Sequence, residues 1–72
     1  MSALDTALLK AHAHQDTLLL MHLYTQAADE TCDSDAAGFY LTHAYVFALE
    51  AGASEAPLLR QRLIEMGRES PD

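Results

Sequence analysis

Apolar residues recur at helical spacing from the beginning of the chain. The first of them fall three or four residues apart: Leu4, Ala7, Leu8 and Ala11. This spacing predicts a short helix over about 3–14. Ser2 and Asp5 have the spacing of a capping box, which places the start of the helix at Ser2.

A second apolar stripe follows, formed by Leu19, Leu20, Leu23, Tyr24, Ala27 and Ala28. It predicts a helix over about 16–30, and Asp16 is placed to cap its first turn. No glycine or proline separates the two stripes, so one long helix over 3–30 is an alternative. A break is favoured because the apolar spacing lapses at Gln15, and because a hairpin gives so short a chain a larger core.

The most apolar segment of the chain is 36–51, where Glu50 is the only charged residue. Either Asp33 or Ser34 can cap a helix here, which predicts a helix over 35–51. The segment is too short to span a bilayer, which takes about 20 apolar residues. A helix that is apolar on all sides is usually buried on most of them, so we expect this helix at the centre of the fold.

Gly52 is placed to end that helix in the left-handed conformation. A last helix is predicted over about 54–67, with Ser54 as its cap and Pro57 in its first turn, where the missing N–H costs little. Its apolar face consists of Leu58, Leu59, Leu63, Ile64 and Met66. Two residues that end helices are expected to stop it: Gly67 and Pro71.

The composition agrees with an all-α fold. Val46 and Ile64 are the only β-branched aliphatic residues, whereas the strong helix formers alanine and leucine are frequent. The length of 72 residues allows a single domain over 1–72. We therefore expect four short helices in two antiparallel hairpins, with a three-helix bundle that has a long first helix as the alternative.

The chain is acidic, with 11 acidic residues against 4 basic ones and a net charge of -7. A negative surface repels phosphate groups, so neither nucleic acid nor an anionic membrane is expected as a partner. The N-terminal residues show no basic region followed by a long apolar run, so we expect no signal peptide. A cytoplasmic protein is the expectation.

Two stretches carry similar spacings of small and aromatic residues. The first reads Leu8-x2-Ala11-x3-Gln15-Asp16-x3-Leu20-x3-Tyr24-x2-Ala27, and the second reads Leu41-x2-Ala44-x3-Ala48-x3-Gly52 before the last helix. Both resemble the helical hairpin of the tetratricopeptide (TPR) family. Ala27-Ala28-Asp29, followed by Asp33-x-Asp35-Ala36, is similar to the junction between Sel-like repeats, a related family. The resemblance implies two TPR-like antiparallel hairpins.

The sequence departs from the TPR pattern at three positions. Gln15 stands where the family usually has glycine, and Pro57 and Gln61 stand where it prefers a small residue and an aromatic one. The two units are also spaced slightly wider than the family period. Such repeats are normally stacked at least three times. Two units therefore suggest either a divergent single domain or a self-associating one.

Histidine is the residue type with the most potential for site chemistry. The four histidines are His12, His14, His22 and His43. His12 and His14 are two residues apart and point to different sides of a helix, so we expect no metal site and no cofactor. His43 lies within the apolar helix, where a buried ring needs a hydrogen-bond partner. It is either a core histidine bonded to a carboxylate or carbonyl group, or a pH-sensitive interface contact.

No catalytic residue is identified, and we do not expect an enzyme. Cys32 has acidic neighbours, which disfavour the thiolate that a nucleophile needs. The acidic cluster consists of Asp29, Glu30, Asp33 and Asp35. It lacks the turn glycine and distal glutamate of a calcium loop. The sequence also has no nucleophile elbow and no glycine-rich phosphate loop.

The candidate site is a surface. If the TPR-like arrangement holds, the groove side of the two first helices carries Leu9, His12, Phe39, Thr42, Val46 and Leu49. In TPR proteins that concave side often binds a peptide or a helix. This set is more apolar than a solvated groove, so it is either core beneath a terminal helix or a surface that binds a partner.

Two functions follow as hypotheses. The first is a non-enzymatic module for protein–protein interaction, whose partner is a protein or peptide, including a second copy of itself. The alternative is a small metal- or ligand-responsive regulator that uses His12, His22 and His43.

Overall fold

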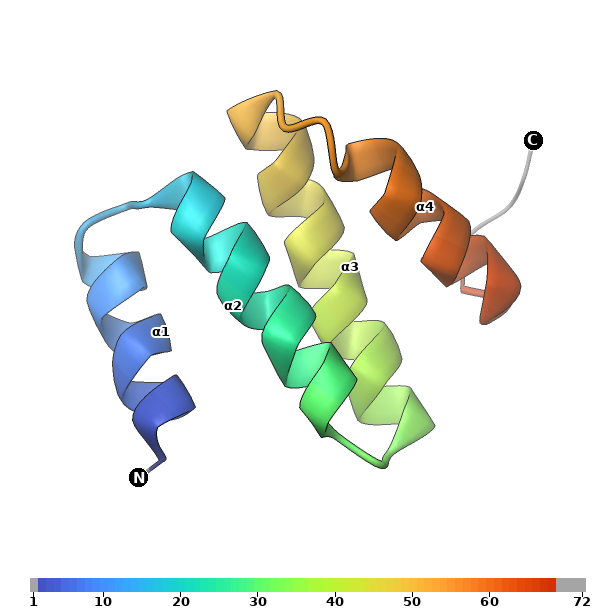
Figure 1. Cartoon of the computed structure of the whole chain (residues 1–72), viewed down its shortest axis with the longest axis horizontal. Coiled ribbons are helices and arrows are strands. Elements are labelled where there is room, and N and C mark those ends of the chain that lie inside the picture. Colours follow the sequence, from blue (N-terminus) through green and yellow to red (C-terminus); the bar gives the residue numbers. More distant parts are fainter. Residues whose placement is uncertain (1, 69–72) are drawn as a thin grey trace.

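The computed structural model of this chain describes residues 2–68. These residues form four α-helices and no strand (Figure 1): α1 (Ala3–Ala13), α2 (Thr17–Glu30), α3 (Ser34–Ala51) and α4 (Ala56–Glu65). The prediction of an all-α fold with four helices is confirmed. None of the described helices has the length and apolarity to cross a membrane.

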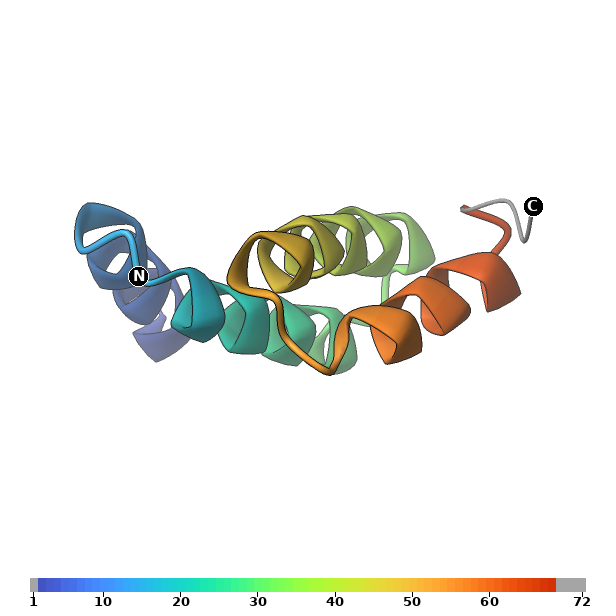
Figure 2. The same ribbon diagram turned by 90° about the horizontal axis from the view of Figure 1, so that it is seen from above.

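The helices form a flat body in which each one packs against the next in sequence. α1 contacts α2, α2 contacts α3 along most of its length, and α3 contacts α4. Figure 2 shows that α3 lies on one side of the layer, above both α2 and α4. α3 is therefore the central helix, as expected, but its packing partners lie on one side only.

The break between α1 and α2 is confirmed. α1 ends at Ala13, and Gln15 adopts a left-handed conformation with φ of 53°. The carboxylate of Asp16 then accepts a hydrogen bond from the Leu19 amide at 3.2 Å and caps α2. The three-helix alternative with a long first helix is wrong, because the chain turns at these residues although neither is glycine or proline.

Local capping signals set most of the other helix ends. Ser2 and Asp5 form the predicted capping box, with a bond of 3.1 Å from the Asp5 amide to the Ser2 hydroxyl. Of the two candidate caps for α3, Asp33 is the one used, since its carboxylate accepts from two backbone amides. Gly52 ends α3 in the left-handed conformation, with φ of 62°.

The predicted cap of the last helix is wrong. α4 begins at Ala56 rather than at Ser54, and its N-cap residue Glu55 makes no side-chain capping bond. The Ser54 hydroxyl donates to the Glu55 carboxylate instead, at 3.3 Å. These residues form a turn, which is closed by a hydrogen bond from the Ala56 amide to the Ala53 carbonyl. The helix therefore begins two residues after Ser54. Pro71, predicted to help end α4, lies outside the described residues.

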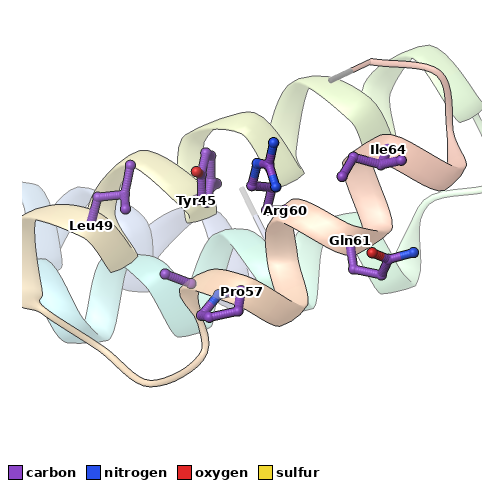
Figure 3. A pocket seen from close by; sticks show the side chains of 7 residues that line it. Tyr45, Leu49, Pro57, Arg60, Gln61 and Ile64 are labelled. Carbon is purple, nitrogen blue, oxygen red and sulfur yellow. The ribbon is translucent and has the colours of Figure 1, made fainter. Parts of the chain in front are cut away.

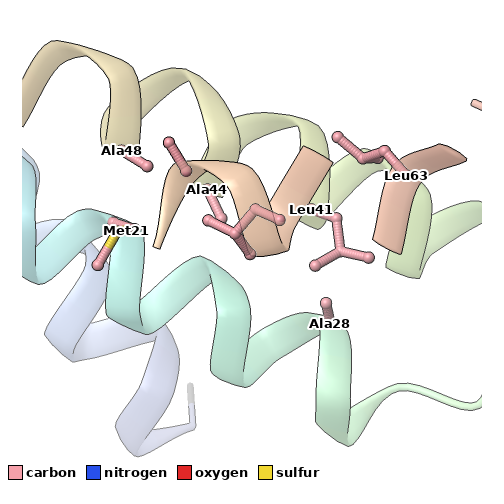
Figure 4. Packing of buried hydrophobic residues seen from close by; sticks show 8 residues of the cluster. Met21, Ala28, Leu41, Ala44, Ala48 and Leu63 are labelled. Atoms are coloured by element: carbon pink, nitrogen blue, oxygen red, sulfur yellow. The ribbon is translucent and has the colours of Figure 1, made fainter. Parts of the chain in front are cut away.

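The main core lies where α2, α3 and α4 meet (Figure 4). Ala44 and Ala48 are fully buried, which brings α3 close to its neighbours, and Leu41 fills the space beside them. The other labelled members of this cluster are Met21 and Ala28 from α2 and Leu63 from α4. A smaller cluster joins α1 to α2 through Ala11, Leu20 and Leu23.

Two described ion pairs connect the C-terminal part of the chain to the rest of the fold, one from α4 and one from Arg68, which follows α4. Arg62 binds Asp29 at the end of α2 at 2.6 Å, and Arg68 binds Asp35 at the start of α3 at 2.5 Å. All four side chains are more than a third exposed, so each pair contributes at most about 1 kcal/mol. With Asp33 as a cap, three members of the acidic cluster thus have structural roles.

Gly38 leaves room for the second of these ion pairs, and we expect a double-mutant cycle to show it. A methyl group at Gly38 would lie 2.6 Å from Nε and 2.8 Å from Cζ of Arg68, so Gly38→Ala must displace the guanidinium group. In the Arg68→Ala variant this conflict is absent, and Gly38→Ala is expected to gain about 0.5–1 kcal/mol, as usual for a helix interior.

Urea unfolding of the complete cycle measures the difference. Gly38→Ala is expected to stabilise the wild type less than it stabilises the Arg68→Ala variant. Equal gains in the two backgrounds would show that Arg68 does not occupy this place.

Candidate functional site

One side of α3 carries a row of uncharged, mainly apolar side chains that no described helix covers. We call this row the outer stripe; its members are Phe39, Thr42, Val46 and Leu49. Phe39, Val46 and Leu49 are 58%, 45% and 57% exposed, whereas Ala44 and Ala48 on the opposite side are 0% exposed. The expectation that α3 is buried on most sides is therefore wrong, because α2 and α4 cover the same half of the helix.

Thr42, the one polar residue of the outer stripe, already has a hydrogen-bond partner. Its hydroxyl donates to the Gly38 carbonyl of the same helix at 2.8 Å. The stripe also contains no charged residue. A partner can therefore cover the whole stripe without leaving a polar side-chain group of it unpaired.

All six residues proposed from the sequence lie on the surface, and none belongs to the core. The four on α3 form the outer stripe, whereas Leu9 and His12 are exposed on α1, with Leu9 at 59%. The imidazole of His12 reaches towards α3, since its ring centroid lies 6.1 Å from that of Phe47. No described contact joins Leu9 to the outer stripe.

A group of aromatic rings extends from Phe39 of the outer stripe to the place where side chains of α1, α2 and α3 meet. We call it the aromatic cluster; its members are His12, Tyr24, Phe39, Tyr40, His43 and Phe47. Tyr24 is at its centre and stacks on His43 and Phe47, with centroid distances of 5.1 and 5.8 Å. The cluster links α1 to α3 through side chains, although the two helices do not pack directly.

Both histidines of the aromatic cluster have hydrogen-bond partners. Nε2 of His12 and the hydroxyl of Tyr24 are bonded at 2.9 Å, and Nδ1 of His43 donates to the Phe39 carbonyl at 2.9 Å. The predicted carbonyl partner of His43 is thus found within its own helix. His43 is half-buried rather than part of the core. The sequence did not reveal the cluster, because neither the apolar stripe of α2 nor the TPR-like motif, both of which include Tyr24, shows which rings of α1 and α3 it contacts.

The histidines form no evident metal site. Within residues 2–68, no group of three or more His, Cys, Asp and Glu side chains is placed to hold a metal ion. His22, the third histidine of the metal hypothesis, is exposed on α2 and has no contact with the aromatic cluster among those described. Cys32 is a free thiol on the surface.

Burial, and secondarily the nearby Tyr40, raises the pKa of the Tyr24 hydroxyl above its usual value of 10.0. The neutral phenol therefore stabilises the fold. This contribution is complete below the pKa of the unfolded chain and is lost as the pH rises through the higher pKa of the folded protein. We expect the wild type to lose stability above about pH 10 more steeply than Tyr24→Phe, which has no hydroxyl to ionise.

Urea unfolding of both proteins between neutral and strongly alkaline pH measures this difference. At neutral pH, Tyr24→Phe is expected to cost about 0.5–1.5 kcal/mol, because the hydrogen bond to His12 is lost. If stability falls with pH equally in the two proteins, ionisation of Tyr24 is not the cause of the alkaline loss of stability.

Two hollows border the outer stripe. The larger, of about 440 Å³, lies between α3 and α4 (Figure 3). Its lining residues are Tyr45, Leu49, Ala56, Pro57, Arg60, Gln61 and Ile64. The smaller, of about 190 Å³, is lined by Thr42, His43, Val46 and Phe47. The smaller hollow is mainly apolar, whereas Arg60 and Gln61 make the larger one mixed in character. Because the stripe contributes to both, a partner that packs on it meets a concave border on either side.

The comparisons with known proteins do not identify a relative. No family model, curated protein or solved structure matches this chain. The TPR-like resemblance therefore stays a prediction, and the function is argued from the site itself.

Proposed function

We propose that this chain is a non-enzymatic helical module that binds another protein through the outer stripe. The observation that carries the proposal is the combination of exposure and chemistry: three large apolar side chains are about half exposed, and no charge lies among them. Contiguous exposed apolar residues on a soluble domain mark interaction surfaces. A helix is the best-fitting partner, since an amphipathic helix inserts its apolar side chains into such a surface at matching intervals.

The wider architecture we propose is a pair of antiparallel TPR-like hairpins, α1 with α2 and α3 with α4. It is supported by packing that links each helix only to its sequence neighbours, as in helical repeat proteins. The contact between α2 and α3, which would join the two hairpins, is the most extensive of the three. The aromatic cluster then lies between the first helices of the two hairpins, beside the proposed binding surface.

The acidity of the chain favours a protein partner over nucleic acid or an anionic membrane, because its net charge is -7. The compartment we propose is the cytoplasm. An exposed, unpaired Cys32 is compatible with a reducing compartment.

Site-specific photo-cross-linking in the source cells tests the proposed function. A photoreactive amino acid at position 46 is expected to give one discrete protein adduct. The adduct is expected to disappear when Phe39→Asp is added to the same chain. The matched control places the photoreactive group at position 18, because Leu18 is 48% exposed on α2, outside the stripe.

The position of the adduct decides the outcome. A discrete adduct at position 46 only, lost with Phe39→Asp, supports a binding surface on α3. The absence of any adduct at position 46, or the same adducts at both positions, would refute the proposed function.

A further inference from the structure

The turn that follows α1 has the same hydrogen bonds as the turns that follow α3 and α4. After α1, the Gln15 amide donates to the His12 carbonyl at 3.1 Å, and the Asp16 amide donates to the Ala11 carbonyl at 3.0 Å. The equivalent pairs of bonds after α3 and α4 have lengths between 2.8 and 3.2 Å. A turn with this pair of bonds places one residue in the left-handed conformation.

The left-handed residue is a glycine in two of these three turns. Gly52 after α3 and Gly67 after α4 have φ of 62° and 74°, which glycine adopts readily because it has no β-carbon. Gln15 after α1 has φ of 53°, and it is the one residue other than glycine with a positive φ in the described part of the chain. A residue with a β-carbon is strained in this conformation. Strain of this kind is typical of segments that switch between two arrangements.

The attachment of α1 to the rest of the fold is small. Figure 1 shows α1 at the edge of the layer, and α2 is the one described helix on which it packs. Its buried residue, Ala11, packs with Leu20 and Leu23 of α2. His12 adds the hydrogen bond to Tyr24 and the ring contact with Phe47. Opening the turn at Gln15 therefore detaches α1 as a unit and leaves a face of α2 that fits α1.

We propose that two copies of this chain exchange α1, so that α1 of each copy packs on α2 of the other. In the exchanged dimer the turn is open, and Gln15 returns to the right-handed region without strain. The contacts between the copies are those that α1 already makes within one chain, so no new complementary surface is needed. Exchange of an identical element is a low-cost route to a dimer for this reason. The outer stripe takes no part in it, so the inference is independent of the proposed function.

The net charge of the chain opposes this contact only weakly. α1 carries one acidic and one basic residue, Asp5 and Lys10, so with neutral histidines it brings no net charge to the other copy. Repulsion between the remaining parts of the two chains is screened beyond about 8 Å at physiological ionic strength. We therefore expect the dimer to become more stable as salt is added.

The exchanged helix competes with the helix of the same chain. A short connection gives the tethered α1 an effective concentration on the order of millimolar. The strain released at the two turns of a dimer lowers the chain concentration at which exchange competes. We therefore expect a dissociation constant below about one millimolar. Because α1 must detach before it is exchanged, the dimer is expected to form when a concentrated sample is refolded.

Two substitutions at position 15 test the exchange. Gln15→Gly removes the strain from the closed turn and disfavours the right-handed conformation of the open one. It is expected to raise the dissociation constant about a hundredfold or more, because a dimer contains two such turns. Gln15→Ala is the matched control, since alanine keeps the β-carbon and therefore the strain. Its dissociation constant is expected to stay within a few-fold of the wild-type value.

Sedimentation equilibrium measures the mass of each full chain after refolding from urea at up to millimolar concentration, with reductant present. The expected result is a dimer for the wild type and for Gln15→Ala, and a monomer for Gln15→Gly at the same concentration. A wild type that stays monomeric throughout would overturn the proposal. A Gln15→Gly variant that dimerises as strongly as Gln15→Ala would overturn it as well.

Val46→Asp in the same experiment separates the exchange from the proposed function. The exchanged dimer is expected to persist in this variant, because Val46 belongs to the outer stripe. If Val46→Asp abolishes the dimer, the copies associate through the outer stripe; the exchange is then refuted, whereas binding through the stripe is not. If the exchange is confirmed but no photo-adduct forms at position 46, the proposed function fails alone.

Discussion

Val46→Asp is expected to abolish association through the outer stripe while leaving the fold intact. Val46 is near the centre of the stripe and 45% exposed, so an aspartate there is hydrated in the monomer. Association would have to bury this carboxylate against apolar side chains, with no group to hydrogen-bond or ion-pair with it. Such burial costs several kcal/mol. We therefore expect the dissociation constant to rise by about a hundredfold or more.

The matched control for Val46→Asp is Leu18→Asp, which introduces the same charge at an exposed apolar residue outside the outer stripe. Its dissociation constant is expected to stay within a few-fold of the wild-type value. Circular dichroism and urea unfolding establish that both variants are folded. If Val46→Asp binds the partner protein as the wild type does, or if Leu18→Asp weakens this binding equally, the outer stripe is not the interface.

The second large effect is expected from Leu41→Ala, on the opposite side of the same helix. Leu41 is 1% exposed and packs in the main core with residues of α2 and α4. Removing a buried leucine typically costs about 2–5 kcal/mol. A chain of this length has about 4–10 kcal/mol of stability in all. Leu41→Ala is therefore expected to lose a large part of the stability and to approach unfolding at room temperature.

Leu58→Ala is the control for this change, because Leu58 is 68% exposed on α4. The same substitution there is expected to alter the free energy of unfolding by less than about 0.5 kcal/mol. Urea unfolding followed by circular dichroism measures both variants. Similar losses for Leu41→Ala and Leu58→Ala would contradict the assignment of the core to the inner side of α3.

Together these two substitutions separate the roles of the two sides of α3. The sequence shows an almost uniformly apolar helix, so its apolar pattern does not decide whether the face of Phe39, Val46 and Leu49 is core or surface. The structure divides them because α2 and α4 both pack on the side of Ala44 and Ala48, where small side chains allow close approach. This leaves Phe39, Val46 and Leu49 exposed rather than in the core, which supports the proposal that they bind a partner.

The helix boundaries could be predicted because they depend on local chemistry. The hydrogen bonds between Ser2 and Asp5, and the left-handed conformation of Gly52, involve residues that are close in sequence. Ser54 has a hydroxyl that could cap a helix in the same way, but it lies in the turn between α3 and α4, before the helix begins. The break at Gln15 was harder to predict, since it uses a left-handed residue that is not glycine.

The candidate site could be predicted only in part, because it depends on the positions of whole helices. The six proposed residues are exposed as a binding surface requires, and four of them share one face of α3. The role of Tyr24 could not be derived from spacing alone. Its ring meets His12 from α1 and Phe47 from α3, and these contacts exist only when three helices are in place.

Photo-cross-linking from position 46 in the source cells tests the central claim most directly. We predict one discrete protein adduct, which disappears when Phe39→Asp is added to the same chain. The absence of an adduct at position 46, or the same adducts from the control position at Leu18, would contradict the account.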